Sequence, residues 1–261
     1  MDLGMPALIE LKGLEACVAL CKALDLQFVE LNMNLPEYQV DRIETGAFAE
    51  IARQYGIYYT IHLDENLNPC DFNEKVADAY TETVLQTVAL AKQLSIPVLN
   101  MHLSRGVYFT LPEKKVYLLD EYMDVYLARL TIFRDICERA IGGAEMKICI
   151  ENAGGYDKEF LKKGLALLLE SKAFALTFDI GHNAGVGGSD EAIIMKHKDR
   201  LCHMHMHDAI GKSSHLPLGT GELDLPKYFY LASAQHCRVV LETKTVAGLK
   251  ESVAWMKNKG G

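Results

Sequence analysis

Short apolar runs alternate with longer helical patterns along the whole chain, and this alternation limits the fold more than any other feature. Between the apolar runs, hydrophobic residues recur at spacings of three and four, as in segments 80–94 and 126–140. The candidate strands cover 3–9, 28–33, 58–63, 97–103, 147–151, 175–179, 201–207 and 239–242. Strands that alternate with helices form a parallel sheet, so eight such units predict an α/β fold of the (β/α)₈ TIM barrel type.

Composition and charge limit the domain count and the partners. No linker or low-complexity segment divides the 261 residues, so we expect residues 1–261 to form one domain. With 27 basic and 35 acidic residues the net charge is −8, which repels phosphate backbones and anionic membranes. The seven cysteines form no C-x-x-C pair and predict buried thiols of a reducing compartment. No membrane span or leader is visible, so we expect a cytoplasmic protein.

The run Leu201–Asp208 contains three histidines at a spacing of two. A β-strand repeats its side-chain direction every two residues, so His203, His205 and His207 are predicted to share one face. The residues between them are apolar, which indicates a buried strand, where an imidazole without a partner is costly. We therefore expect at least one of these histidines to bind a ligand or to act in catalysis.

Five other candidate strands end in a polar residue of a type that binds metals. These residues are His62, His102, Glu151, Asp179 and Glu242. One such residue alone would most simply begin a surface loop, but the carboxyl ends of barrel strands all meet at the active-site mouth. Three carboxylates in one mouth would repel each other unless a cation neutralised them. A divalent ion with carboxylate and imidazole ligands satisfies this arrangement.

Two further histidines follow these strands. His182 lies three residues after Asp179, across a glycine, and His215 begins a glycine-rich loop. A loop histidine can be satisfied by water alone, but both positions favour contact with a metal or a substrate. His197 and His236 lie in polar segments, and we assign them no role.

The order of these residues resembles the xylose isomerase-like barrel superfamily, which includes sugar isomerases, ketose 3-epimerases, inosose-type enzymes and endonuclease IV-type AP endonucleases. The motifs that carry the resemblance are Glu151, Asp179-x-x-His182, His205-x-x-Asp208, the loop 215–221 and Glu242. The resemblance implies a metal quartet of Glu151, Asp179, His205 and Glu242 that binds Zn²⁺ or Mn²⁺, with Co²⁺ or Mg²⁺ as alternatives. It also implies that His62, His102, His182 and His215 match ligands of additional metals in the endonucleases.

The sequence departs from the endonuclease pattern at several positions. Ser213 stands where the endonucleases carry an aspartate ligand two residues before the loop histidine. The loop 32–39 has no Lys or Arg, and the segment after His62 is acidic, which opposes binding of a DNA backbone. His207 stands where relatives carry Lys or Asn, and it could compete with His205 for the ligand role.

We therefore predict a metal-dependent sugar or sugar-phosphate isomerase or epimerase that acts by proton transfer through a metal-stabilised enediolate. Glu151 and Glu242 would serve as acid and base. The residues expected to contact the substrate are His182, His62, His102, Arg105 and Lys212, the last two through a phosphate if one is present.

Two other functions stay open at this point. One is an endonuclease IV-like, zinc-dependent AP endonuclease, and the other is a barrel that retains a metal without turnover. The expected partner is a small sugar or polyol rather than nucleic acid or a membrane. The sequence leaves open whether the chain forms a homo-oligomer.

Overall fold

The computed structural model describes residues 1–153 and 155–259, and within them eight parallel strands close into a barrel. Around the barrel the order is β1-β12-β9-β8-β7-β4-β3-β2. The strands are β1 (Asp2–Pro6), β2 (Phe28–Asn32), β3 (Tyr58–His62), β4 (Val98–His102), β7 (Lys147–Glu151), β8 (Phe174–Asp179), β9 (Leu201–Met206) and β12 (Arg238–Leu241). All eight strands expected from the sequence are present, and the predicted (β/α)₈ fold is confirmed.

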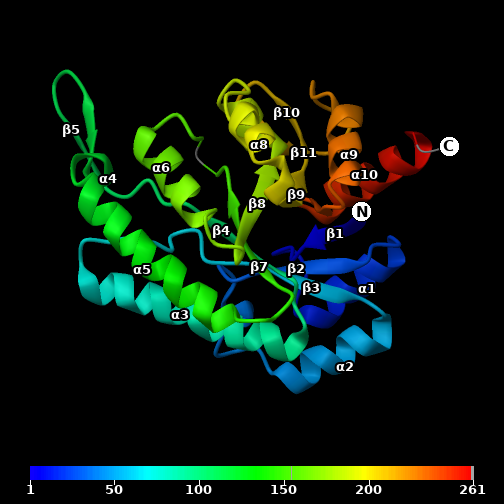
Figure 1. Cartoon of the computed structure of the whole chain (residues 1–261). Helices are drawn as coiled ribbons and strands as arrows, with labels where there is room; N and C mark the ends of the chain where they lie inside the picture. The colour runs from blue at the N-terminus through cyan, green and yellow to red at the C-terminus, as the bar shows by residue number, and fades with distance from the viewer. Residues whose placement is uncertain (154, 260–261) are drawn as a thin grey trace.

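Helices surround the barrel (Figure 1). They are α1 (Leu14–Ala23), α2 (Thr45–Tyr55), α3 (Glu74–Leu94), α4 (Leu118–Glu121), α5 (Met123–Ile141), α6 (Glu159–Leu168), α7 (Ile180–Gly185), α8 (Glu191–Lys196), α9 (Leu225–Ala234) and α10 (Val246–Lys259), with 3-10 turns η1 (Pro36–Tyr38) and η2 (Lys198–Arg200). The expected helical segments 80–94 and 126–140 lie within α3 and α5, which pack against each other. None of the helices in the described ranges is long and apolar enough to cross a membrane.

Alternation along β7 shows how the barrel wall separates the core from the site. Ile148 and Ile150 belong to the main hydrophobic core, which includes buried α5 residues. The residues between and after them, Cys149 and Glu151, contact side chains from β9 across the interior of the barrel. Each strand therefore supplies one apolar face for folding and one face for the interior of the barrel.

Two hairpins outside the barrel were not expected from the sequence. They are β5 (Tyr108–Thr110) with β6 (Lys115–Tyr117), and β10 (Asp208–Ile210) with β11 (Ser213–Leu216). The second hairpin directly follows β9 and includes His215. Asp208 anchors the glycine-rich loop after it, because its carboxylate accepts the backbone N–H groups of Ala209, Gly219 and Leu223 at 2.9, 2.9 and 3.1 Å.

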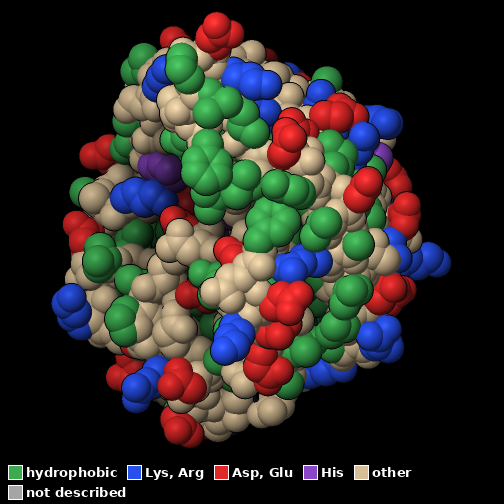
Figure 2. Space-filling model, turned by 90° about the vertical axis from the view of Figure 1, so that its left-hand side faces the viewer, with side chains coloured by type: hydrophobic (Ala, Val, Ile, Leu, Met, Phe, Trp, Pro, Cys, Tyr) green, Lys and Arg blue, Asp and Glu red, His purple; other side chains and the backbone are tan. Residues whose placement is uncertain are grey.

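Figure 2 shows the face of the molecule on the side of the β5–β6 hairpin. Hydrophobic side chains gather there, and acidic and basic side chains are interspersed around them. The exposed hydrophobic residues of the hairpin are Val107, Tyr108, Phe109 and Leu111. This mixed charge pattern differs from the basic stripe that a nucleic-acid-binding surface needs.

Candidate metal centre

The polar residues predicted at the strand ends lie together in the mouth of the barrel. Glu151 and Asp179 close β7 and β8, His205 lies near the end of β9, and Glu242 follows β12. Their exposed fractions are 2%, 0%, 0% and 9%, respectively. Isolated charges buried to this degree would be unstable, so the four groups must compensate one another or share a cation.

His205 lies at the centre of this group. Its Nδ1 atom is 3.0 Å from Glu242 Oε2, 3.4 Å from Glu151 Oε2 and 3.8 Å from Asp179 Oδ2. Burial opposes a charged imidazole, but the surrounding carboxylates outweigh it and hold the pKa of His205 well above its usual value. The pKa values of Glu151 and Glu242 are lowered well below their usual range, chiefly because His205 offsets the cost of burial.

Several buried polar atoms in the mouth are placed as ligands of a metal ion rather than as hydrogen-bond partners of one another. Within the described residues, His102 Nε2, His182 Nδ1, Glu242 Oε2 and both ring nitrogens of His205 have no hydrogen-bond partner. His205 Nδ1 and Glu242 Oε2 nevertheless lie only 3.0 Å apart. Two atoms that each bind one ion at about 2.1 Å lie roughly 3.0–3.4 Å from each other. Glu151, Asp179 and His205 offer ligand atoms within 4.8 Å of one another, Glu242 lies 3.0 Å from His205, and this donor set fits a divalent ion such as Zn²⁺ or Mn²⁺. Glu242 and Asp179 also form a group of this kind with His207 and His215.

A second set of candidate ligands adjoins the first. His62 Nε2 and His102 Nε2 lie 3.5 and 3.4 Å from Glu151 Oε2. His62 Nδ1 lies 2.7 Å from the carbonyl oxygen of Leu63, to which it donates, so its Nε2 atom is directed toward Glu151. His62, His102 and Glu151 are therefore the residues that would hold a further ion.

His182, His207 and His215 form the opposite side of the mouth. His182 Nδ1 lies 3.1 Å from Glu151 Oε1 and 3.4 Å from Asp179 Oδ2. The rings of His207 and His215 stack with their centroids 4.3 Å apart. His215 Nε2 lies 3.6 Å from Glu242 Oε1. The structure thus brings both additional histidines predicted from the sequence to the same mouth.

The two competing histidines of β9 and its continuation differ in their hydrogen bonds. His207 Nδ1 accepts the backbone N–H of His215 at 2.8 Å, and His207 Nε2 lies 3.1 Å from both carboxylate oxygens of Asp179. His207 is therefore satisfied by the protein itself. His205 Nδ1 has no hydrogen-bond partner in the described part of the chain, which favours His205 as the ligand.

The sequence analysis missed Glu30, which lies beneath the metal centre. Glu30 Oε1 is 2.8 Å from His205 Nε2, and Glu30 Oε2 is 3.2 Å from His203 Nε2. The Thr60 hydroxyl also donates to Glu30 Oε2 at 3.0 Å. One signal was available, because a glutamate in the middle of the apolar strand Phe28–Asn32 would need a buried partner.

Two other residues missed from the sequence orient the glutamates. The Asn100 side-chain amide donates to Glu151 Oε2, and Lys244 Nζ lies 2.9 Å from Glu242 Oε1. The structure gives less support to the two residues predicted to contact a phosphate, Arg105 and Lys212. Arg105 pairs with Asp157 at 3.2 Å, and Lys212 is exposed at the turn of the β10–β11 hairpin.

A closed parallel barrel with buried carboxylates and imidazoles at its carboxyl end defines this protein as a TIM barrel with a candidate metal centre. A family model described as "xylose isomerase-like TIM barrel" matches residues 18–259. The chain belongs to this family.

Comparisons with individual proteins agree with the barrel fold. An uncharacterised protein of Methanocaldococcus jannaschii is 25% identical over 185 residues, which cover 67% of this chain and 60% of that protein's length. The crystal structure of a D-tagatose 3-epimerase-like protein is similar with a TM-score of 0.81 and 20% identity, covering 99% of this chain and 96% of that chain. The IOLI protein, solved with a zinc atom, is similar with a TM-score of 0.74 and 17% identity, and the match covers 100% of this chain and 96% of that chain.

Proposed function

We propose that this protein is a metal-dependent sugar or sugar-phosphate isomerase or epimerase. The observation that carries the proposal is the position of His205 Nδ1 between the carboxylates of Glu151 and Glu242, at 3.4 and 3.0 Å. The proposal draws further support from the similarity to a D-tagatose 3-epimerase-like protein and to a zinc-containing structure.

The two glutamates have different neighbours, which suits an acid and a base. Glu151 accepts the Asn100 amide and lies next to His62, His102 and His182. Glu242 pairs with Lys244, whose side chain is 59% exposed at the mouth. In the proposed reaction, one glutamate removes the proton next to a carbonyl group and the other returns a proton. A bound divalent ion would polarise the carbonyl and the adjacent hydroxyl group.

His182 is placed to hold the substrate. Its Nδ1 atom faces Glu151 and Asp179, and its side chain remains 27% exposed. A partly exposed ring at the rim can hydrogen-bond a sugar hydroxyl group while its inner edge faces the carboxylates.

Solvent exchange tests this chemistry directly. The protein would be incubated in D₂O with Mn²⁺, Co²⁺ or Zn²⁺ and a panel of ketoses and their phosphates. We expect deuterium at the carbon that is deprotonated, even where net conversion is small, and a chelator should abolish the exchange. Conversion without deuterium would assign a hydride shift and remove the proton-transfer roles of Glu151 and Glu242. A panel that shows neither exchange nor conversion would favour a barrel without turnover.

The second candidate is a zinc-dependent phosphodiester hydrolase, and the set His62, His102 and Glu151 favours it because it offers a further ion site. About one ion per purified chain would support the isomerase, and two or three would support the hydrolase. Because the chain has a net charge of −8, we expect a duplex with an abasic site to bind no tighter than about 10⁻⁴ to 10⁻⁶ M at physiological salt. Metal-dependent incision of that duplex would replace the sugar-enzyme proposal.

A further inference from the structure

Two cysteines meet inside the barrel at the end opposite the metal centre. Cys149 is the third residue of β7, and Cys202 is the second residue of β9. Their Sγ atoms lie 3.3 Å apart, although the residues are 53 positions apart in the sequence. Val98 and Ala175 pack around them. We call this arrangement the floor pair.

Only one thiol of the floor pair is accessible. Cys149 is buried, whereas Cys202 is partly exposed. Cys202 lines a cavity of about 390 Å³ together with Lys147, Lys172 and Arg200. This cavity opens at the amino-terminal end of the strands, because Lys147 begins β7 and Arg200 directly precedes β9. A small solute can therefore reach Cys202 without passing through the metal centre.

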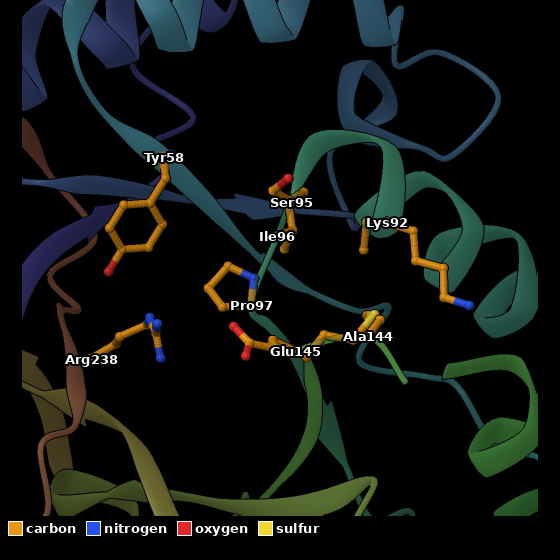
Figure 3. Close-up of a pocket in the computed structure, with 10 residues that line it drawn as sticks. Tyr58, Lys92, Ser95, Ile96, Pro97, Ala144, Glu145 and Arg238 are labelled. Atoms are coloured by element: carbon orange, nitrogen blue, oxygen red, sulfur yellow. The ribbon is translucent and has the colours of Figure 1, made fainter. Parts of the chain in front are cut away.

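Several basic side chains lie near this thiol, although Asp199 also lines the cavity. Hydrogen bonding from Cys149 lowers the pKa of Cys202, and Arg238, Lys147 and Arg200 lower it further, which outweighs burial. Arg238 lies at the start of β12, and its Nε atom is buried without a hydrogen-bond partner among the described residues. Figure 3 shows Arg238 and Tyr58 on one side of a neighbouring cavity of about 480 Å³, facing Pro97 and Glu145.

The other cysteines provide a contrast within the same chain. Burial raises the pKa values of Cys21, Cys137 and Cys237 to about 12, and all three are buried. A partly exposed thiol near cations, with a second thiol beside it, matches the environment of cysteines that react with oxidants.

We propose that Cys202 and Cys149 form a peroxide-reactive dithiol site on the floor of the barrel, independent of the sugar chemistry at the mouth. The Cys202 thiolate attacks hydrogen peroxide, its sulfur is oxidised to a sulfenic acid, and the O–O bond breaks to release hydroxide. The Cys149 sulfur then attacks the Cys202 sulfur, the S–O bond breaks, and the Cys149 proton leaves with the hydroxide as water. Closing the disulfide requires the two Sγ atoms to approach by roughly 1.3 Å, and it also requires the backbones of β7 and β9 to move toward each other, because β8 lies between them.

Peptide mapping of the intact protein tests the proposal without any mutation. The reduced full-length chain would be treated with a few equivalents of hydrogen peroxide, alkylated under denaturing conditions and digested with trypsin. Cleavage after Lys147, Lys158, Arg200 and Lys212 places Cys149 in peptide 148–158 and Cys202 in peptide 201–212. We expect these peptides to be linked, the link to disappear with a reductant, and the count of free thiols to fall from seven to five.

Variants test which cysteine is oxidised to the sulfenic acid and which one then attacks it. Cys149→Ser should leave a dimedone-reactive sulfenic acid on peptide 201–212, and Cys202→Ser should prevent both the adduct and the link. Cys237→Ser is the matched control, because Cys237 directly precedes β12 at the same end of the barrel, and it should not change the link. Seven free thiols after peroxide, a link to the Cys237 peptide 228–238, or oxidation of buried Cys137 as fast as Cys202 would each overturn the proposal. If a variant does not fold, the mapping of the wild-type chain still decides.

Discussion

Glu30 Oε1 lies 2.8 Å from His205 Nε2, whereas the other ring nitrogen, Nδ1, faces the candidate metal ligands Glu151 and Glu242. The contact reaches across the barrel interior, because β2 and β9 are not neighbours in the sheet. A carboxylate on one ring nitrogen fixes the tautomer and orientation of an imidazole whose other nitrogen binds a metal. Glu30 is therefore placed to keep the proton on Nε2 and leave Nδ1 free for an ion.

The first prediction follows from this contact. Glu30→Gln should lower the affinity for Zn²⁺ or Mn²⁺ by about 10- to 100-fold, because the amide supports His205 less strongly than a carboxylate does. Titration calorimetry on metal-free protein measures the change. Glu37→Gln, at an exposed position after the same strand, is the control and should bind as the wild type does. Equal affinity in the Glu30 variant would mean that the carboxylate does not orient His205.

The second prediction separates the two central histidines. His205→Ala should lower metal affinity by at least about tenfold, since it removes a direct ligand. His207→Ala should have a smaller effect, because His207 is already satisfied by Asp179 and by the backbone of His215. Competition with a chromogenic chelator compares the two variants. The reverse order of affinities would assign the ligand role to His207.

The third prediction concerns the proton-transfer pair. Glu151→Gln and Glu242→Gln should each reduce turnover by about 10²- to 10⁴-fold, the usual contribution of general acid–base catalysis. Circular dichroism should show a folded barrel in both variants. Glu251→Gln, exposed on α10, serves as the control and should retain full activity. Near-wild-type turnover in either site variant would remove that glutamate from the reaction.

The fourth prediction is a dependence of stability on pH in the metal-free protein. The pKa of His62 is raised to about 9 from its usual 6.5, because hydrogen bonding and charge from Glu151 exceed the cost of burial. A raised folded-state pKa contributes stability that is complete below about 6.5 and is lost as the pH rises through about 9. The melting temperature of chelator-treated protein should therefore fall across this window.

Variants can assign this pH effect to the histidine. In His62→Gln the decline of the melting temperature between pH 6.5 and 9 should be smaller than in the wild type, because one of the contributing protons is gone. His182, whose pKa is also raised to about 9, should account for part of the decline that remains. Equal slopes in the wild type and the His62 variant would contradict this assignment.

The sequence was informative wherever a polar residue closes an apolar strand. Glu151 and Asp179 were placed correctly at the barrel mouth, because strand direction and fold class alone fix where a strand ends. Glu30 and the floor pair could not be placed in this way. Their partners lie on distant strands, and which residues meet inside a barrel depends on its closure and register, which a single strand does not reveal.

The sequence pattern did not predict the β10–β11 hairpin either, because its strands are only three and four residues long. The glycine-rich segment was predicted as a loop, yet part of it pairs in the hairpin that carries His215. Short antiparallel pairs have weak periodicity, so their existence depends on tertiary contacts such as the three N–H groups held by Asp208.

The β10–β11 hairpin makes one candidate additional ligand, His215, separable from the barrel. The quartet Glu151, Asp179, His205 and Glu242 comes from the strands and the residue that follows β12, so the barrel itself fixes the positions of these residues. His215 instead comes from a surface element whose length and sequence can vary without altering strand order. A change of a few residues outside the common scaffold is therefore enough to add or remove this candidate ligand.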